Sequence, residues 1–179
     1  MMGVFEQCFA VVVGEEGGYG NDYTDPGNWT GGACGVGTLR GTKYGISAKA
    51  FPSLDIANLT LADARAIYRR DYWQRIRGDD LPPPVALVVF DAAVNSGVEQ
   101  AGRWLEAASG APVDQGVIGP ETLAAVQAAS GRGAELIVDM LMSRLVFLAS
   151  LPEWRDFRDG WTRRILGLPF KAMQLQGGA

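Results

Sequence analysis

Glu16 and Asp25 flank a glycine-rich segment, and two carboxylates nine positions apart are candidates for an acid–base pair. On a helical wheel, Glu16 falls in the middle of an apolar stripe that begins at Phe5, so we expect its carboxyl group to be partly desolvated. It also lies at the expected carboxyl end of that helix, where the helix dipole favours the protonated form. Both effects suit a general acid near neutral pH. The alternative is a solvent-facing glutamate beside a helix stop.

Asp25 follows nine residues later in the sequence Asp25-Pro26-Gly27, within a loop that could fold back over Glu16. A protonated carboxylic acid and an ionised carboxylate are together the working groups of glycoside hydrolysis. The alternative for Asp25 is a conformational role, because Asp-Pro-Gly is common turn chemistry. Taken without Glu16, the turn role is the simpler interpretation.

The composition narrows the chemistry further, because the 179 residues include no histidine. Zinc amidases and peptidases need imidazole ligands, and serine or cysteine hydrolases usually need histidine as the base. Cys8 and Cys34 are too few for a four-thiolate zinc site. We expect two free, buried thiols, or a pair in an oxidising compartment. Hydrolysis must therefore depend on carboxylates, and we predict neither a metal nor a cofactor.

The charge balance indicates which partners to exclude. The chain has 16 Lys and Arg residues against 20 Asp and Glu residues, for a net charge of −4. An acidic chain argues against binding to nucleic acid.

No apolar stretch approaches the roughly 18 residues of a membrane span, and the first residues lack the pattern of a secretory signal. We expect a monomer, made in the cytoplasm and not inserted in a membrane.

The elements that would position these residues are mostly helices. A helix over about 4–16 precedes an irregular segment rich in Gly, Asn, Asp and Thr. Short strands around 35–39 and 42–46, joined by Arg40-Gly41, would form a hairpin. Apolar periodicity and start signals predict further helices that begin near Thr60, Val85, Gly119, Ala134 and Trp154. The predicted fold is mainly α, with a small β-hairpin next to the first helix.

Several motifs occur in the order found in family 108 glycoside hydrolases, which the chain resembles. These are phage and prophage N-acetylmuramidases that cut the MurNAc–GlcNAc bond of peptidoglycan. The resemblance also implies a lysozyme-like helical domain. The motifs are Glu16-Gly17-Gly18-Tyr19, Asn21-Asp22, Asp25-Pro26-Gly27, Thr42-Lys43-Tyr44-Gly45-Ile46-Ser47, Ala66-Ile67-Tyr68, Tyr72-Trp73, Leu81-Pro82-Pro83, Phe90 to Gly97 and Gly116 to Leu123.

The resemblance implies roles for particular residues. The catalytic Glu of the family motif maps onto Glu16, and the spacing to Asp25 resembles the Glu–Asp part of a Glu–Asp–Thr triad in phage-type lysozymes. Thr30 and Thr42 are both candidates for the Thr, and Thr42 is preferred because a hairpin strand would hold its hydroxyl rigidly. Glu16 would protonate the departing oxygen, and Asp25 with Thr42 would stabilise positive charge on the sugar or activate water.

Further residues are candidates for contacts with sugar. Tyr19, Tyr44 and Trp73 could stack on sugar rings. Asn95 shares a face of the predicted 85–96 helix with Asp91. It would hydrogen-bond an N-acetyl group, or alternatively both residues would satisfy backbone groups inside the helical bundle.

Two regions are expected in one globular unit. Residues 1–110 would form the lysozyme-like catalytic region, and residues 111–179 a helical region that resembles a peptidoglycan-binding module. The expected function is an N-acetylmuramidase acting on peptidoglycan glycan strands, as a phage endolysin released to the cell wall through a holin lesion. The alternatives are a lytic transglycosylase and a non-catalytic wall-binding or virion protein.

Overall fold

The computed structural model describes residues 2–14 and 17–176, which form two compact units. Unit 1 comprises Met1–Cys8 and Arg70–Ala179, and unit 2 comprises Phe9–Arg69. The first boundary lies inside helix α1 (Val4–Val12). This division differs from the expected boundary at residue 110, because helices from both sides of that position pack together in unit 1.

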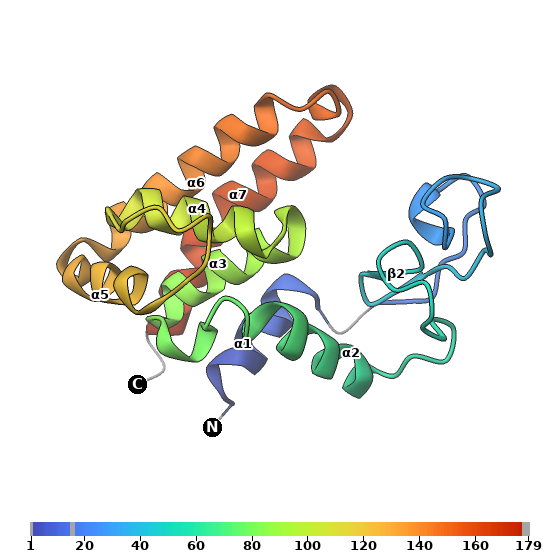
Figure 1. Ribbon diagram of the computed structural model, residues 1–179, viewed down its shortest axis with the longest axis horizontal. Coiled ribbons are helices and arrows are strands. Elements are labelled where there is room, and N and C mark those ends of the chain that lie inside the picture. Colours follow the sequence, from blue (N-terminus) through green and yellow to red (C-terminus); the bar gives the residue numbers. More distant parts are fainter. Residues whose placement is uncertain (1, 15–16, 177–179) are drawn as a thin grey trace. The chain divides into compact units, whose positions relative to one another are not determined.

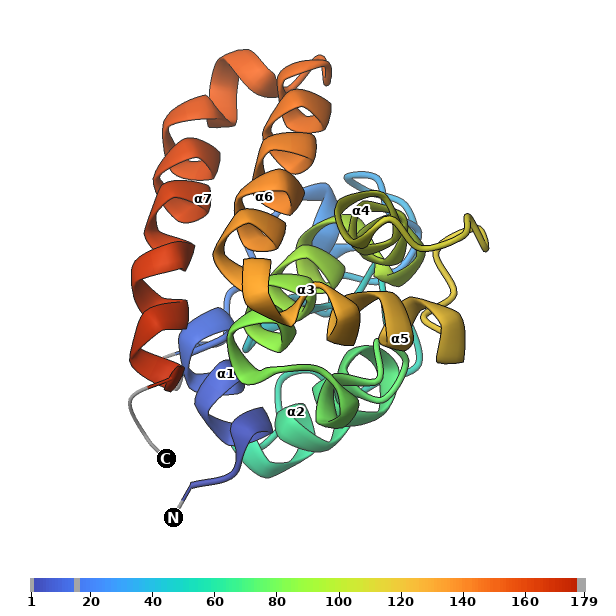
Figure 2. The same ribbon diagram turned by 90° about the vertical axis from the view of Figure 1, so that its left-hand side faces the viewer.

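Unit 1 is a helical bundle built around α3 (Pro83–Ser96), which contacts α4 (Val98–Ser109), α6 (Gly133–Ala149) and α7 (Trp154–Gln176). Every residue of α3 from Pro84 to Ala93 is buried, as its apolar sequence predicts. Figures 1 and 2 show α6 and α7 running side by side, with α5 (Pro120–Ala128) near the start of α6. Short 3-10 turns span Gly78–Asp80 and Ser130–Arg132. No helix among the described residues is long and apolar enough to cross a membrane.

Unit 2 combines irregular loops with little regular structure. It contains a 3-10 turn at Pro26–Asn28, strands β1 (Thr42–Lys43) and β2 (Ile46–Ser47), and helix α2 (Leu61–Tyr68), which a π-helical turn (Arg69–Trp73) follows. Helix α2 begins with the predicted capping box, because Thr60 Oγ1 accepts from Asp63 N and Asp63 Oδ2 accepts from Thr60 N. The expectation of a mainly α chain with a small hairpin is confirmed.

The hairpin itself lies elsewhere than predicted. Its strands pair antiparallel, with Thr42 opposite Ser47 and Lys43 opposite Ile46, so the turn is Tyr44-Gly45 and not Arg40-Gly41. Both turn residues have positive φ, 51° at Tyr44 and 74° at Gly45, which is the backbone of a two-residue turn that matches strand twist. Leu39, expected in a strand, makes an isolated bridge to Trp29.

Helix α1 is shorter than the predicted 4–16. It ends at Val12, and Gly14 adopts a left-handed φ of 77° while its N–H bonds to the Phe9 carbonyl. A glycine in this conformation is a common helix terminator, because it carries no Cβ to clash. The chain therefore leaves the helix several residues before the predicted end at about residue 16.

Candidate active site

The segment around the expected general acid lies against the hairpin turn. Glu16 itself lies outside the described residues, but Gly17 directly follows it. A Cβ added to Gly17 would lie 2.6 Å from the Cα of Tyr44, so only glycine allows the two backbones to approach this closely. Unit 2 thus brings Gly17 against the Thr-Lys-Tyr-Gly motif, although more than twenty residues separate the two in the chain.

Asn28 is the centre of the polar network in unit 2. Its side chain is buried, with 3% of its surface exposed. Its Nδ2 donates to the Asp22 carbonyl over 3.0 Å, and its Oδ1 accepts from the Thr42 hydroxyl over 2.8 Å. Its own carbonyl accepts from the backbone N–H groups of Arg40 and Gly41. The sequence interpretation missed Asn28, and its place directly after Asp-Pro-Gly was the available signal.

Asp25 is exposed and caps the 3-10 turn that follows it. Its Oδ1 accepts from Gly27 N over 2.8 Å, which is the turn role considered from sequence. Its Oδ2 has no hydrogen-bond partner in the described part of the chain, so one oxygen stays available to a ligand. Its carbonyl accepts from Asn28 N over 3.1 Å, which joins Asp25 to the network around Asn28.

A further carboxylate, Asp22, lies in the same loop. Hydrogen bonds from the Thr24 backbone N–H (2.9 Å) and the Thr24 hydroxyl (2.8 Å) hold the pKa of Asp22 below its ordinary value. Asp22 is therefore ionised at neutral pH. It stabilises the loop that precedes Asp25.

The two candidate threonines have different partners. Thr42 is half-buried in β1, and its backbone exchanges two hydrogen bonds with Gly20, of 2.9 and 2.7 Å. Its hydroxyl joins the network through Asn28. Thr30 instead closes the loop that follows, because its Oγ1 accepts from Thr38 N over 2.8 Å. Side-chain hydrogen bonds thus connect Thr42, and not Thr30, to the turn that carries Asp25.

Tyr19 and Tyr44, two of the aromatic residues expected to contact sugar, also lie in unit 2. The Tyr19 side chain is 42% exposed. Tyr44 is half-buried, its carbonyl accepts from the Tyr68 hydroxyl over 3.1 Å, and the Lys43 ammonium lies 5.7 Å from the centre of its ring. Tyr19 therefore offers the larger accessible surface of the two.

Trp73 lies in the core of unit 1 and not at a surface. It is 0% exposed, and its ring meets the edges or faces of Phe5 and Phe90 at centroid distances of 5.5 Å. Its Nε1–H donates to Asp79 over 2.9 Å. The expectation that Trp73 stacks on substrate was wrong, because a fully buried ring has no free face. Sequence patterns alone do not separate a buried tryptophan from a binding one.

Asn95 and Asp91 satisfy partners within unit 1. Asn95 is exposed near the end of α3, and its Nδ2 donates to the Asp91 carbonyl over 2.9 Å. The buried Asp91 carboxylate accepts from Arg144 of α6 over 2.5 Å and from Arg164 of α7 over 2.7 Å. This ion-pair cluster joins three helices. Asp91 therefore has a structural role, but its carboxylate pairs with arginine side chains and not with the backbone groups considered from sequence.

The segment expected to bind peptidoglycan is fixed to α4 by a buried carboxylate. Glu106 is 1% exposed, and its Oε1 accepts from the backbone N–H groups of Asp114 and Gly116, each over 3.1 Å. Gly116 packs directly against the backbone of α4, where a side chain would collide. These contacts give Gly116 of this motif a structural reason.

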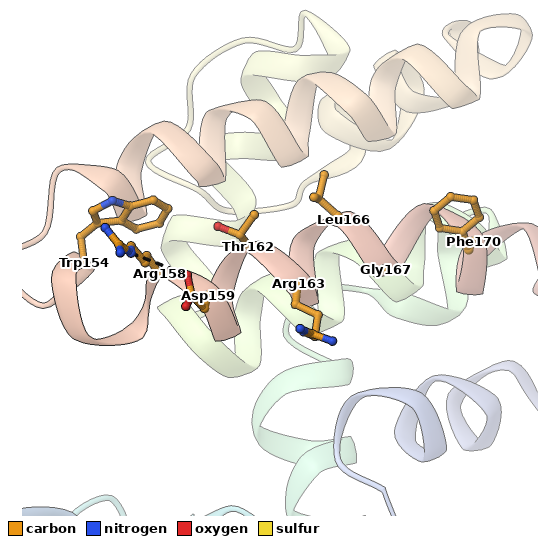
Figure 3. Close-up of a pocket in the computed structure, with 8 residues that line it drawn as sticks. All are labelled: Trp154, Arg158, Asp159, Thr162, Arg163, Leu166, Gly167 and Phe170. Atoms are coloured by element: carbon orange, nitrogen blue, oxygen red, sulfur yellow. Dashed lines mark ion pairs between the residues drawn. The ribbon is translucent and has the colours of Figure 1, made fainter.

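Two of the hollows in the structure can be compared with the carboxylate pair expected for glycoside hydrolysis. In unit 2, a hollow of about 380 Å³ includes Tyr19 and Arg40 in its lining. In unit 1, a wide hollow of about 550 Å³ runs along α7, with Leu166 and Phe170 on one side of the helix and Arg163 on the other (Figure 3). The α7 hollow contains one carboxylate, Asp159, which pairs with Arg158 at 3.6 Å. It therefore lacks the pair of acids that glycoside hydrolysis uses.

Metal ligands do not gather at either place. Within residues 2–14 and 17–176, no group of three Cys, Asp or Glu side chains could hold a metal ion.

Comparison with known proteins identifies the family. The glycosyl hydrolase 108 family matches residues 9–97, which include all of unit 2. The match ends before Asp114, so the expected peptidoglycan-binding region lies outside it. The structure of Brucella abortus SagA is 32% identical in sequence, with 96% of this chain and 94% of that chain covered and a TM-score of 0.78. No curated protein sequence matches. The chain therefore belongs to the glycosyl hydrolase 108 family and is a glycoside hydrolase with a mainly α, lysozyme-like fold.

Proposed function

We propose that this glycoside hydrolase is an N-acetylmuramidase that cleaves the β-1,4 bond from MurNAc to GlcNAc in peptidoglycan glycan strands. Membership of family 108 implies the peptidoglycan substrate. The observation that carries the residue assignment is the network in which Asn28 joins Thr42 to the turn of Asp25, in the same unit as the Glu-Gly-Gly-Tyr motif.

Each residue then has a chemical task. Glu16 donates a proton to the glycosidic oxygen as the bond breaks, while positive charge develops on the sugar ring. Asp25, through its unpartnered Oδ2, stabilises that charge or accepts a proton from the attacking water. Thr42 positions the water with an oxygen whose proton is already directed to Asn28. Tyr19 and Tyr44 contact sugar rings, and Asn95 is the further candidate for an N-acetyl contact.

The reducing ends of the products test the proposal. Purified peptidoglycan would be digested with the wild type, with Glu16→Gln and with Glu15→Gln, then reduced with borohydride and analysed by mass spectrometry. Glu15 is the matched control, because it is the neighbouring acid outside the family motif. We expect reduced MurNAc ends from the wild type and Glu15→Gln, and a loss of nearly all of them from Glu16→Gln. Turnover near the wild-type rate in Glu16→Gln would refute the assignment.

A lytic transglycosylase is the second candidate, and the geometry of Asp25 is the observation that favours it. A transglycosylase needs only the acid and closes an anhydro ring without water, so Asp25 could serve the turn alone. Anhydro-MurNAc ends in the same digest would establish this reaction. In that case Asp25→Asn would retain activity, whereas a muramidase would lose it.

We also propose that the enzyme is an endolysin that reaches the wall through a membrane lesion. The test is expression in a bacterial host with and without a pore-forming holin. Lysis that requires both the holin and an intact Glu16 supports the proposal. Equal lysis without the holin contradicts it.

A further inference from the structure

The hollow of about 380 Å³ in unit 2 contains a charged side chain that the proposed cleavage does not use. This volume falls in the range of small-molecule sites, which is about 300–1,000 Å³. We call it the Arg40 hollow. Its lining residues are Tyr19, Leu39, Arg40, Asp55, Ile56 and Ala57.

One wall of the Arg40 hollow is an aromatic ring in a defined position. A Cβ added to Gly41 would lie 2.6 Å from Cε2 and 2.9 Å from Cζ of Tyr19, so the tyrosine ring lies directly over this glycine. Gly41 also has a φ of 78°, which favours glycine. An isolated backbone bridge between Gly20 and Thr42 fixes the loop next to Tyr19. The ring is thus held beside Arg40 with 42% of the side chain exposed.

Arg40 presents an uncommitted guanidinium on a fixed backbone. Its N–H donates to the Asn28 carbonyl over 2.9 Å, whereas its side chain has no hydrogen bond or ion pair to any described residue. By contrast, two other exposed arginines, Arg75 and Arg77, pair with carboxylates at 2.9 and 2.8 Å.

The acidic residue in the same lining, Asp55, does not neutralise this charge. Asp55 accepts from the Asn58 amide over 2.8 Å and makes no ion pair with Arg40. A free guanidinium beside an aromatic ring suits a ligand that carries a carboxylate next to a sugar, because guanidinium binds carboxylate with two parallel hydrogen bonds.

The hollow is connected to the candidate active site through Asn28. The carbonyl of Asn28 holds Arg40 and Gly41, and its side chain holds Thr42. Tyr19 follows Glu16 by three positions in the chain. Because Tyr19 lines the hollow, a sugar that contacts Tyr19 would have its substituents near it.

We propose that the Arg40 hollow binds a carboxylate carried by the lactyl arm of MurNAc, and that Arg40 sets the preference of the enzyme for muramic acid over uncharged amino sugars. This inference rests on the proposed muramidase function. The carboxylate has two possible sources. It belongs to the lactyl group itself where the stem peptide is absent, and to the stem peptide where it is attached.

Soluble glycan strands in four forms test the proposal and separate the sources. The first form carries stem peptides, and the second is the same material after amidase treatment, which leaves free lactyl carboxylates. The third and fourth are these two after carbodiimide coupling with ammonia, which converts carboxylates to amides. KM and kcat would be measured for the wild type, Arg40→Gln and Arg40→Lys. Arg103→Gln serves as the control, because it removes an exposed arginine of unit 1.

We expect Arg40→Gln to raise KM on a carboxylate-bearing strand by about tenfold, as loss of a charge-assisted hydrogen bond does, with little change in kcat. Arg40→Lys should recover part of the loss, and Arg103→Gln should match the wild type. Amidated strands should bind the wild type and Arg40→Gln equally weakly. An effect confined to the first form identifies the stem peptide as the source, and one confined to the second form identifies the lactyl group.

The inference about Arg40 and the muramidase proposal are refuted by different results. If Arg40→Gln leaves KM unchanged on both carboxylate-bearing forms, or changes it equally on the amidated forms, the inference about Arg40 is overturned. If the wild type releases no reduced MurNAc ends from any form, the muramidase proposal itself fails. Calorimetric binding in the Glu16→Gln background provides a readout that does not depend on turnover.

Discussion

The Thr42 hydroxyl donates a hydrogen bond to Oδ1 of Asn28 over 2.8 Å, although the two residues are 14 positions apart. Asn28 is buried, so its amide oxygen cannot reach water, and the Thr42 hydroxyl supplies the hydrogen bond instead. The contact joins strand β1 to the turn that Asp25 caps. It is the structural basis for preferring Thr42 as the third member of the proposed site.

Thr42→Val should reduce kcat strongly, because valine keeps the shape of threonine but removes the hydroxyl. The substitution also leaves Asn28 Oδ1 unpaired, which should lower the free energy of unfolding by about 1–3 kcal/mol. Thr42→Ser should retain most of both properties. Turnover on soluble glycan strands and urea unfolding are the measurements.

Thr30→Val is the matched control for this prediction. Thr30 Oγ1 holds Thr38 N in an exposed loop, so its loss should reduce stability by about 1 kcal/mol and leave kcat unchanged. If Thr30→Val abolishes turnover and Thr42→Val does not, the choice between the two threonines is reversed.

Gly45→Ala should destabilise unit 2 by about 1–3 kcal/mol, measured by urea unfolding. Gly45 has a φ of 74°, which alanine adopts with strain, and its ideal Cβ would lie 2.6 Å from the hydroxyl oxygen of Tyr68. Tyr68→Phe removes this oxygen and also loses the hydrogen bond to the Tyr44 carbonyl. We therefore expect the double variant to be less destabilised than the sum of the single ones. Strict additivity would show that the hydroxyl does not oppose the new Cβ.

Asp91→Asn should lower the free energy of unfolding by about 3–5 kcal/mol, because it leaves the charge of Arg144 buried and uncompensated. The side chains of Asp91 and Arg144 are 2% and 3% exposed. Arg164→Ala should have a smaller effect, since Arg164 is 36% exposed. Asp80→Asn, which breaks the surface pair with Arg77, should change stability by about 0–1 kcal/mol. Equal effects of Asp91→Asn and Asp80→Asn in thermal unfolding would contradict this account.

The two cysteines should differ in reactivity at pH 8. Burial raises the pKa of the Cys8 thiol to about 12, whereas Cys34 is exposed. We expect one equivalent of thiol to react with a disulfide reagent in the folded protein and a second only after unfolding. Cys34→Ser should abolish the first equivalent, and rapid labelling of folded Cys34→Ser would refute the assignment.

The same pKa shift of Cys8 has a consequence for stability. Because the thiol pKa is raised in the folded state, the contribution of Cys8 is complete below its ordinary value of 9.0 and is lost as pH rises toward about 12. Cys8→Ala should therefore weaken the fall in unfolding free energy over this alkaline range. Urea unfolding at several pH values measures the difference.

The hairpin and Trp73 show where sequence interpretation reached its limit. The sequence predicted a strand near residue 42, but the register depended on Tyr44 and Gly45 both accepting a left-handed backbone, which is uncommon for tyrosine. Trp73 lies among motif residues, and only its contacts with Phe5 and Phe90 show that it belongs to the core.

The family, the mainly α class, the capping box at Thr60 and Asp63, and the absence of histidine chemistry were all predictable from the sequence. These properties depend on residue types and on spacings of a few positions, which a local pattern records. The tertiary structure decided which polar groups meet, such as Thr42 with Asn28, and Asp91 with Arg144, 53 positions away. Such pairs form only when packing brings distant segments together, and the need to satisfy buried polar atoms then selects the partners.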